Sequence, residues 1–273
     1  MNTPAPNSPS PRAALSARAP LKASTLADRQ SPIGGVLAPA HPCATLLAAA
    51  NATLLAGARW LSMPLCASLV ACSSAPSPPD WQVNAKSNID RAAEAGLRGD
   101  SRIEAAEFAR ARAEVARTGQ PTLVARVELM RCATRVASLD FVPCIAFDPL
   151  AGDAAPPEQA YARYLAGQAT PADAALLPLA HRSLASEPTA PEAALSAITD
   201  PLSQLIAAGV LLRRNQATPS VIEQAINTAS SQGWRRPLLA WLGVAQQRAQ
   251  AAGAVQEAAR IQRRIDLALP SGR

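Results

Sequence analysis

The chain has 273 residues, which is enough for one or two domains. Aromatic residues make up only 3% of it, while apolar residues make up 49% and include much alanine, so the composition argues against a β-sandwich or β-barrel core. The formal net charge is +6, but residues 1–71 carry five basic residues and one acidic residue, and the remaining body is therefore nearly neutral. A nearly neutral body is not typical of a nucleic-acid-binding domain, and we expect no nucleic acid among the partners.

The first part of the chain has the pattern of a leader. Residues 1–40 are rich in Pro, Ser, Ala and Arg without apolar periodicity, and we expect them to be disordered. Residues 60–71 form an apolar run directly after Arg59, which fits the hydrophobic region of a secretory signal behind its positive charge. This run is too short to span a bilayer, which takes about 20 residues.

The end of this apolar run resembles the lipobox of bacterial lipoproteins. Leu69-Val70-Ala71-Cys72 places a branched apolar residue and small residues before a cysteine, and a Pro/Ser-rich stretch follows. The resemblance implies that residues 1–71 are removed, that Cys72 carries acyl chains such as palmitate, and that residues 72–80 form a tether. Because Ser73 follows the cysteine, the resemblance also implies that the protein is located at the outer membrane, on the face toward the periplasm. The alternative is a buried helix in which Cys72 is incidental.

Five cysteines are present, and the number that can form a disulfide depends on whether residues 1–71 are removed. If residues 1–71 are removed and Cys72 is acylated, Cys132 and Cys144 remain as one pair in an oxidising compartment. Cys132 lies in a helical stretch and Cys144 follows Pro143, so a chain that turns back there brings the two cysteines to disulfide distance. The alternative is two buried free thiols. No CxxC pair or nearby histidine completes a ligand set, so we expect no metal.

The first helical region is expected over residues 81–147. The pattern predicts helices at 82–98, from Ser101 to about Gly119, and at 121–139. Ser101 and Glu104 have the spacing of a capping box at the start of the second helix. Residues 140–156 are a proline-broken connection.

The second helical region is expected over residues 148–273. Thr170, Asp200 and Thr218 each precede a proline, which places an N-cap oxygen before a proline at the first helical position. The predicted helices are 157–167, 171–185, 190–198, 201–215, 219–232, 237–252 and 254–269. Pro178 is expected to kink or split the helix in which it lies. Short joints between such helices predict an all-α fold of antiparallel hairpins, in a bundle or a short solenoid.

One segment near the C-terminus resembles the second half of a tetratricopeptide repeat. Gly253 lies at the turn position, Ala258 follows five residues later, and Pro270 closes the helix. The resemblance implies a repeat-like stack of helical hairpins over about 33 residues.

The sequence lacks the common motifs of catalysis and nucleotide binding, and we expect neither catalytic residues nor a cofactor. His181 is interpreted as a surface residue, and the acidic pair Glu104 and Glu107 as part of a solvated, charged helix face. Tyr161 and Tyr164 are interpreted as core residues rather than as the wall of a groove. Trp241 is likewise expected to pack in the core, whereas Trp234 is expected before the helix that starts at Pro237.

Arginines concentrate on the last predicted helix. Arg260, Arg263 and Arg264 are expected to share one face, opposite a stripe near Val255, Ile261 and Ile265. One interpretation is a solvated face with favourable charges near a helix end. The other is a docking face for an acidic partner or anionic lipid, for which the acidic stretch 151–212 is an internal competitor.

The leading functional hypothesis is a lipid-anchored helical module that binds other envelope proteins or holds an assembly in place, without catalysis. The alternatives are an envelope carrier of a small ligand, and an enzyme acting on cell-wall material with a site built from scattered residues.

Overall fold

The computed structural model describes residues 77–185 and 191–269, and these residues form α-helices and short 3-10 helices with no strand. The all-α prediction is therefore confirmed. In chain order, the first elements are α1 (Asp80–Arg98), α2 (Ser101–Ala116), α3 (Pro121–Ala137), the 3-10 helix η2 (Asp148–Leu150) and α4 (Pro156–Leu165).

The second half begins with short pieces and continues with four longer helices. The short elements are η3 (Pro171–Leu176), η4 (Leu179–His181), α5 (Arg182–Ala185) and α6 (Pro191–Ser196). The longer ones are α7 (Pro201–Arg213), α8 (Pro219–Gln232), α9 (Arg235–Ala251) and α10 (Val255–Ala268). The predicted helix 171–185 is thus split at Pro178, as expected from the missing amide of proline.

Local signals in the sequence explain most of the helix ends. Asp200 accepts a hydrogen bond from the Ser203 amide at 2.8 Å, and Thr218 accepts one from the Val221 amide at 3.3 Å, so both cap a helix that starts with proline. Gly233, which has a φ of 67°, ends α8 in the left-handed region that glycine adopts without strain.

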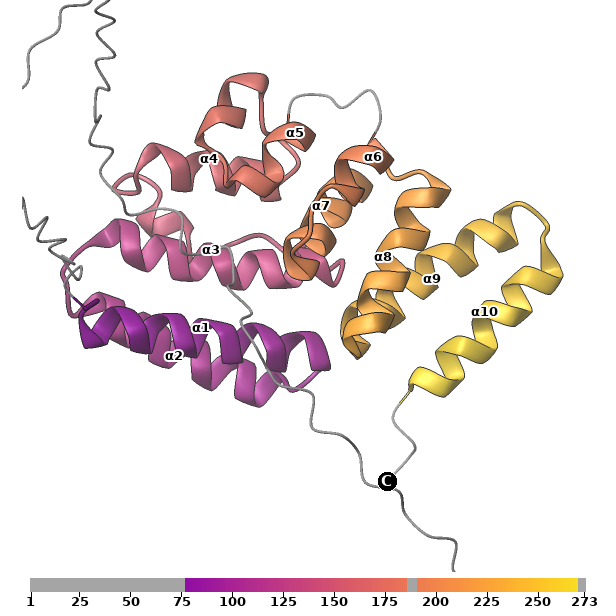
Figure 1. Ribbon diagram of the computed structural model, residues 1–273, viewed down its shortest axis with the longest axis horizontal. Helices are drawn as coiled ribbons and strands as arrows, with labels where there is room; N and C mark the ends of the chain where they lie inside the picture. The colour runs from indigo at the N-terminus through magenta and orange to yellow at the C-terminus, as the bar shows by residue number, and fades with distance from the viewer. Residues whose placement is uncertain (1–76, 186–190, 270–273) are drawn as a thin grey trace, which may run out of the picture. The chain divides into compact units, whose positions relative to one another are not determined.

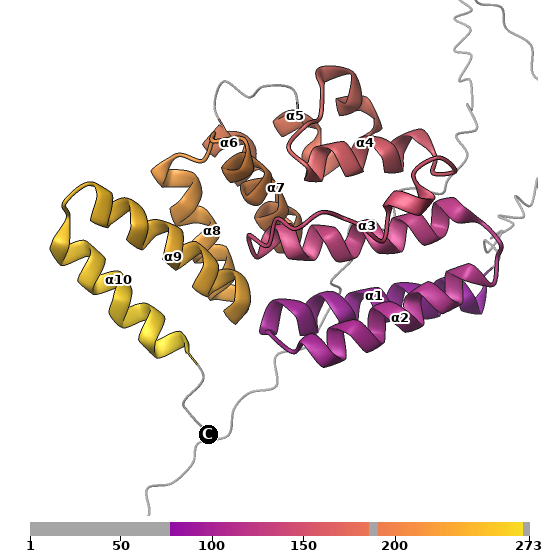
Figure 2. The ribbon, with the colours of Figure 1, turned by 180° about the vertical axis from the view of Figure 1, so that it is seen from behind.

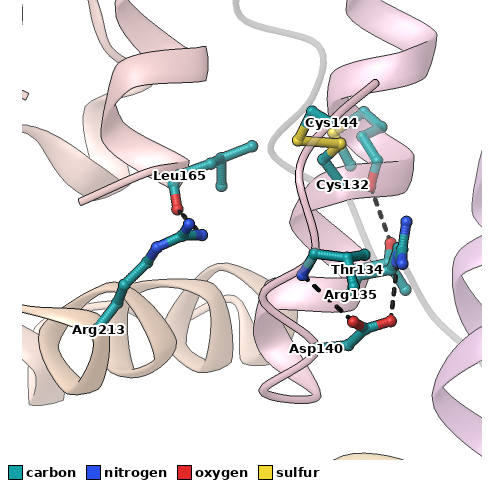
Figure 3. The surroundings of a disulfide bond; sticks show 9 residues. Cys132, Thr134, Arg135, Asp140, Cys144, Leu165 and Arg213 are labelled. Atoms are coloured by element: carbon teal, nitrogen blue, oxygen red, sulfur yellow. Dashed lines mark hydrogen bonds and ion pairs between the residues drawn. A yellow bond between two sulfur atoms is a disulfide. The ribbon is translucent and has the colours of Figure 1, made fainter. Parts of the chain in front are cut away.

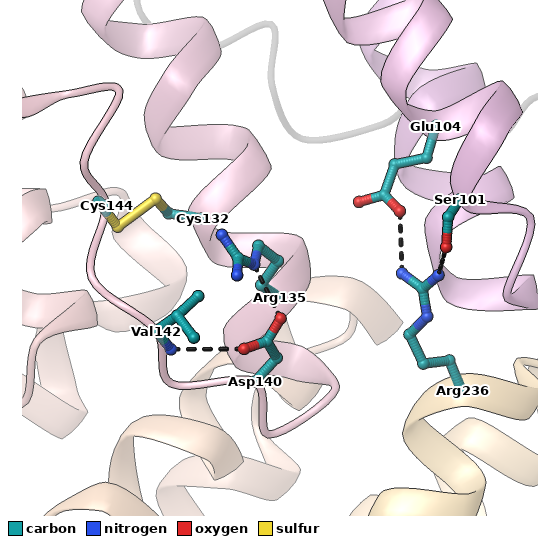
Figure 4. A network of polar contacts seen from close by, with 8 residues as sticks. All are labelled: Ser101, Glu104, Cys132, Arg135, Asp140, Val142, Cys144 and Arg236. Carbon is teal, nitrogen blue, oxygen red and sulfur yellow. Dashed lines mark hydrogen bonds and ion pairs between the residues drawn. A yellow bond between two sulfur atoms is a disulfide. The ribbon is translucent and has the colours of Figure 1, made fainter.

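The capping box predicted at Ser101 is wrong. Helix α2 begins at Ser101, so its N-cap residue is Asp100 rather than Ser101, and Asp100 makes no side-chain cap hydrogen bond. The side chains of Ser101 and Glu104 instead accept hydrogen bonds from Arg236 of α9, at 2.6 and 2.9 Å (Figure 4). A tertiary contact therefore replaces the local one.

Helices α1, α2 and α3 pack on one another, and α3 also contacts α4 and α7. From α7 the chain continues through α8 and α9 to α10, which packs chiefly on α9 at the edge of this series (Figures 1 and 2). Helix α9 also returns to contact α1, so the second-last helix of the series packs on the first.

Two clusters of buried apolar residues fill the spaces between the helices. The smaller one lies among α1, α2 and α3 and includes Phe108, Val115 and Val127. The larger one extends from Leu97 to Ile261 and draws on both regions 81–147 and 148–273. Trp241 is fully buried in this larger cluster, as predicted, and its indole N–H donates to the Ala137 carbonyl at 3.3 Å.

Candidate functional site

The proposed lipidation residue, Cys72, lies outside the described residues, as do the leader 1–71 and most of the tether 72–80. The structure therefore leaves the lipobox interpretation as a prediction. The helical body begins at Asp80, eight residues after Cys72 in the sequence. None of the described helices is both long and apolar enough to cross a membrane.

Cys132 and Cys144 form a disulfide, as predicted, with their Cα atoms 5.9 Å apart (Figure 3). Cys132 lies on α3, and Cys144 lies in the loop that follows this helix. The chain reverses at Leu139, which adopts a φ of 59°. Asp140 holds the turn by accepting hydrogen bonds from Arg135 at 2.9 Å and from the Val142 amide at 3.4 Å (Figure 4).

The three arginines predicted as a docking face all lie exposed on α10. Arg260 forms an ion pair with Glu257 at 2.7 Å, whereas Arg263 and Arg264 have no ion pair within residues 77–185 and 191–269. The apolar stripe predicted opposite them is wrong at Val255, which is 72% exposed. Ala258 and Ile261 are the buried residues of α10, because they are the positions turned toward α9.

A groove of about 260 Å³ lies where α8, α9 and α10 meet. We call it the α8–α10 groove, and the residues that line it include Ile222, Glu223, Ile226, Arg260, Ile261 and Arg264. Arg263 does not line it. The structure thus separates three arginines that helical spacing alone had grouped together.

The acidic stretch 151–212 does not neutralise these arginines within the described residues, contrary to the competition considered from the sequence. Four of its acids have other partners. Glu158 pairs with Arg126, Asp173 pairs with Arg163, Glu192 accepts from Thr218, and Asp200 caps α7. The acids that line the groove together with Arg260 and Arg264 are instead Glu257 and Glu223.

Burial shapes the chemistry of a second group of residues, Tyr161, Tyr164 and His181. The two tyrosines are buried on α4, as expected, but His181 is only 2% exposed, so its placement on the surface was wrong. The ring of His181 lies 4.9 Å from that of Tyr164, and its Nδ1 is 3.2 Å from the Tyr164 hydroxyl. Burial lowers the pKa of His181 to about 4, against a smaller opposing effect of Asp200.

The same burial raises the pKa of both tyrosines. Desolvation is the larger cause at each, and the charge of Asp200 adds to it at Tyr161. All three groups are therefore neutral at pH 7, and their arrangement suits a packed, hydrogen-bonded interior.

Glu104 and Glu107 are buried as well, at 8% and 7% exposure, which corrects the prediction of a solvated acidic face. Glu104 binds Arg236 across the fold, and Glu107 binds Arg91 of α1 as well as Arg110 of its own helix. Each carboxylate is thus held by a guanidinium, so the pair is a helix–helix connection rather than a carboxylate dyad.

Other buried carboxylates are also bound by arginine side chains. Glu128 of α3 binds Arg112 of α2 at 2.9 Å, and Glu158 of α4 binds Arg126 of α3 at 2.5 Å. The hydrogen bonds from Arg163 lower the pKa of Asp173 well below its usual range. Periodicity missed these contacts because it treats every glutamate as a surface residue.

No protein-family model matches the chain, and the searches of curated proteins and of solved structures found no match either.

Proposed function

We propose that this chain is a lipid-anchored, periplasm-facing helical protein of the bacterial outer membrane that binds or positions another envelope protein. The observation that carries the proposal is the disulfide between Cys132 and Cys144 in the helical body. Intrachain disulfides of this kind persist in oxidising compartments such as the periplasm and are rare in the bacterial cytosol. The disulfide therefore supports export of the protein from the cytosol, and the lipobox-like segment that ends at Cys72 would be the export signal.

The position of the helical body relative to Cys72 also supports an anchor. Asp80, where α1 begins, follows Cys72 by eight positions, and this stretch of chain spans at most about 28 Å when fully extended. Acyl chains on Cys72 would therefore hold the body close to the bilayer. Two or more such chains give stable anchoring, because each buried CH₂ contributes about 0.8 kcal/mol.

The α9–α10 hairpin supports the binding part of the proposal. It turns at Gly253, whose φ is 69°, and Ala258 is buried against α9; these are two of the positions on which the proposed tetratricopeptide resemblance rests. Helical hairpin stacks of that type present extended surfaces for other proteins. The α8–α10 groove lies on this part of the fold.

The anchor is tested by acyl labelling in bacterial cells. Cys72→Ala is expected to abolish palmitate incorporation and to leave an unprocessed precursor, because Cys72 is the residue that carries the acyl chains. Cys66→Ala is the matched control, since this cysteine lies in the same leader but outside the lipobox-like segment. Palmitate incorporation that is unchanged in the Cys72 variant contradicts the proposal.

The compartment is tested in the same cells by alkylating free thiols. Cys132 and Cys144 are expected to resist alkylation in the full chain and to react when residues 1–71 are deleted, because the shortened chain stays in the reducing cytosol. Free thiols in the full chain would count against export.

A further inference from the structure

The two walls of the α8–α10 groove carry opposite charges. Helix α8 contributes Glu223 to one wall, and α10 contributes Arg260, Arg264 and a single acid, Glu257, to the other. Within residues 77–185 and 191–269, neither Glu223 nor Arg264 has an ion pair or a side-chain hydrogen bond, whereas Arg260 is shared with Glu257. The groove therefore offers one guanidinium and one carboxylate that are exposed and have no protein partner within the described residues.

The groove exposes little apolar surface. Ile222 and Ile226 from α8 and Ile261 from α10 line it, but each is almost completely buried. An occupant gains a small apolar contact there and larger polar contacts at the walls. Because arginine forks bind carboxylates in a bidentate manner, the α10 wall fits an acidic group best.

We propose that the α8–α10 groove binds an amphipathic helix of a partner protein, with carboxylates along the flank that faces α10 and a basic or amide side chain along the flank that faces α8. Charge complementarity carries the choice of occupant. A uniformly anionic lipid surface would meet Glu223 and Glu257 as well as the arginines, whereas a helix with two different flanks satisfies both walls. The proposal rests on the proposed function only for the location of the partner in the envelope.

The three α10 arginines provide a matched test. Arg260 and Arg264 line the groove and Arg263 does not, although all three are exposed on the same helix. Docking in the groove predicts a loss of binding in Arg260→Gln/Arg264→Gln and no loss in Arg263→Gln. A non-specific attraction to anionic surfaces predicts similar losses in all of these variants, because it depends on net charge alone.

The experiment is site-specific photocrosslinking of the full chain in cells. A photoreactive p-benzoylphenylalanine replaces Asn227, which lines the groove, or Gln247, which is exposed on α9 outside it. We expect a crosslink from position 227 to a segment of another protein with carboxylates at helical spacing, and none to that segment from position 247. The Arg260→Gln/Arg264→Gln variant should lower the yield several-fold, and Arg263→Gln should leave it unchanged.

A synthetic peptide of the crosslinked segment then gives the affinity in solution. Loss of charged hydrogen bonds from two arginines is expected to raise its Kd at least about tenfold, and the wild-type Kd should rise with salt. Unchanged melting curves of the variants confirm that the fold is intact.

Four results would overturn the proposal: a crosslink to a second copy of this chain, a crosslink to lipid, no crosslink at position 227, or an equal loss in the Arg263 variant. Acyl labelling is recorded in the same cells. An acylated chain without the crosslink refutes the groove proposal alone, whereas a crosslinked chain without acylation refutes the anchor alone.

Discussion

At the scale of single residues, burial decides the chemistry of the polar side chains. His181 packs between tyrosines and stays neutral, while Glu104 and Glu107 stay buried because arginines from α9 and α1 reach them. Unpaired buried charges are costly, so each buried carboxylate needs its guanidinium.

The buried histidine predicts a pH-dependent stability. Its pKa is about 4 in the folded chain against 6.5 in the unfolded chain, so the unfolded chain binds an additional proton between these values. Stability from this group is complete above pH 6.5 and is lost as the pH falls toward 4, by up to about 3 kcal/mol. Urea unfolding between pH 4 and 7 measures the loss.

The control for this prediction is His181→Gln, which keeps a polar side chain beside Tyr164 but cannot titrate. Its unfolding free energy should fall less steeply below pH 6.5 than that of the wild type. Parallel pH profiles of the two proteins would show that His181 does not titrate as its burial implies.

At the scale of helices, polar contacts recur at one sequence separation. Arg91 and Glu107 join α1 to α2, Arg112 and Glu128 join α2 to α3, and Gln246 and Gln262 join α9 to α10. In each case the partners are 16 positions apart in the sequence. Antiparallel helices of similar length, joined by short turns, produce this spacing. The contacts link neighbouring helices and help to set their register.

Close approach of helices predicts different effects of alanine at two glycines. A Cβ atom at Gly209 of α7 would lie 2.4 Å from the Val136 carbonyl oxygen of α3, so Gly209→Ala must push two helix backbones apart. We expect it to destabilise the fold by about 1–3 kcal/mol, as overpacking does. The midpoint of denaturant unfolding measures this cost.

Gly243 of α9 is the matched control, because a Cβ atom there meets nothing within 4 Å. Gly243→Ala should stabilise the fold by about 0.5–1 kcal/mol, through the higher helix propensity of alanine. A similar effect of both substitutions would refute the close α3–α7 contact.

At the scale of the described structure, the helices differ in how many residues they contribute to the apolar core. Helices α3 and α7 contribute many residues to the larger cluster, whereas α10 contributes Ile261 and packs chiefly on α9. Elements with few buried apolar contacts open first in the native state.

Hydrogen exchange should therefore be fastest at the amides of α10 and slowest at those of α3 and α7. Mass spectrometry of peptides from the native protein resolves these segments. Protection of α10 equal to that of α7 would contradict the prediction. If a partner helix occupies the α8–α10 groove, it should slow exchange in α10, since it adds contacts there.

The sequence by itself predicted most of the helices, and it favoured the disulfide over two free thiols. Proline at the first helical position and glycine after the last one are local signals, and they located most boundaries to within a few residues. Cys132 and Cys144 are close along the chain, so a single turn at Leu139 brings them together.

Only the tertiary structure decided which polar residues are buried and which arginines line the groove. Glu104 meets Arg236 across 132 residues, and His181 meets a helix that starts 25 residues before it. Arg263 and Arg264 are neighbours in the sequence, yet only Arg264 lines the groove, because its direction on α10 is set by how this helix packs on α9. Periodicity describes one helix at a time, whereas burial depends on helices that are distant in the sequence.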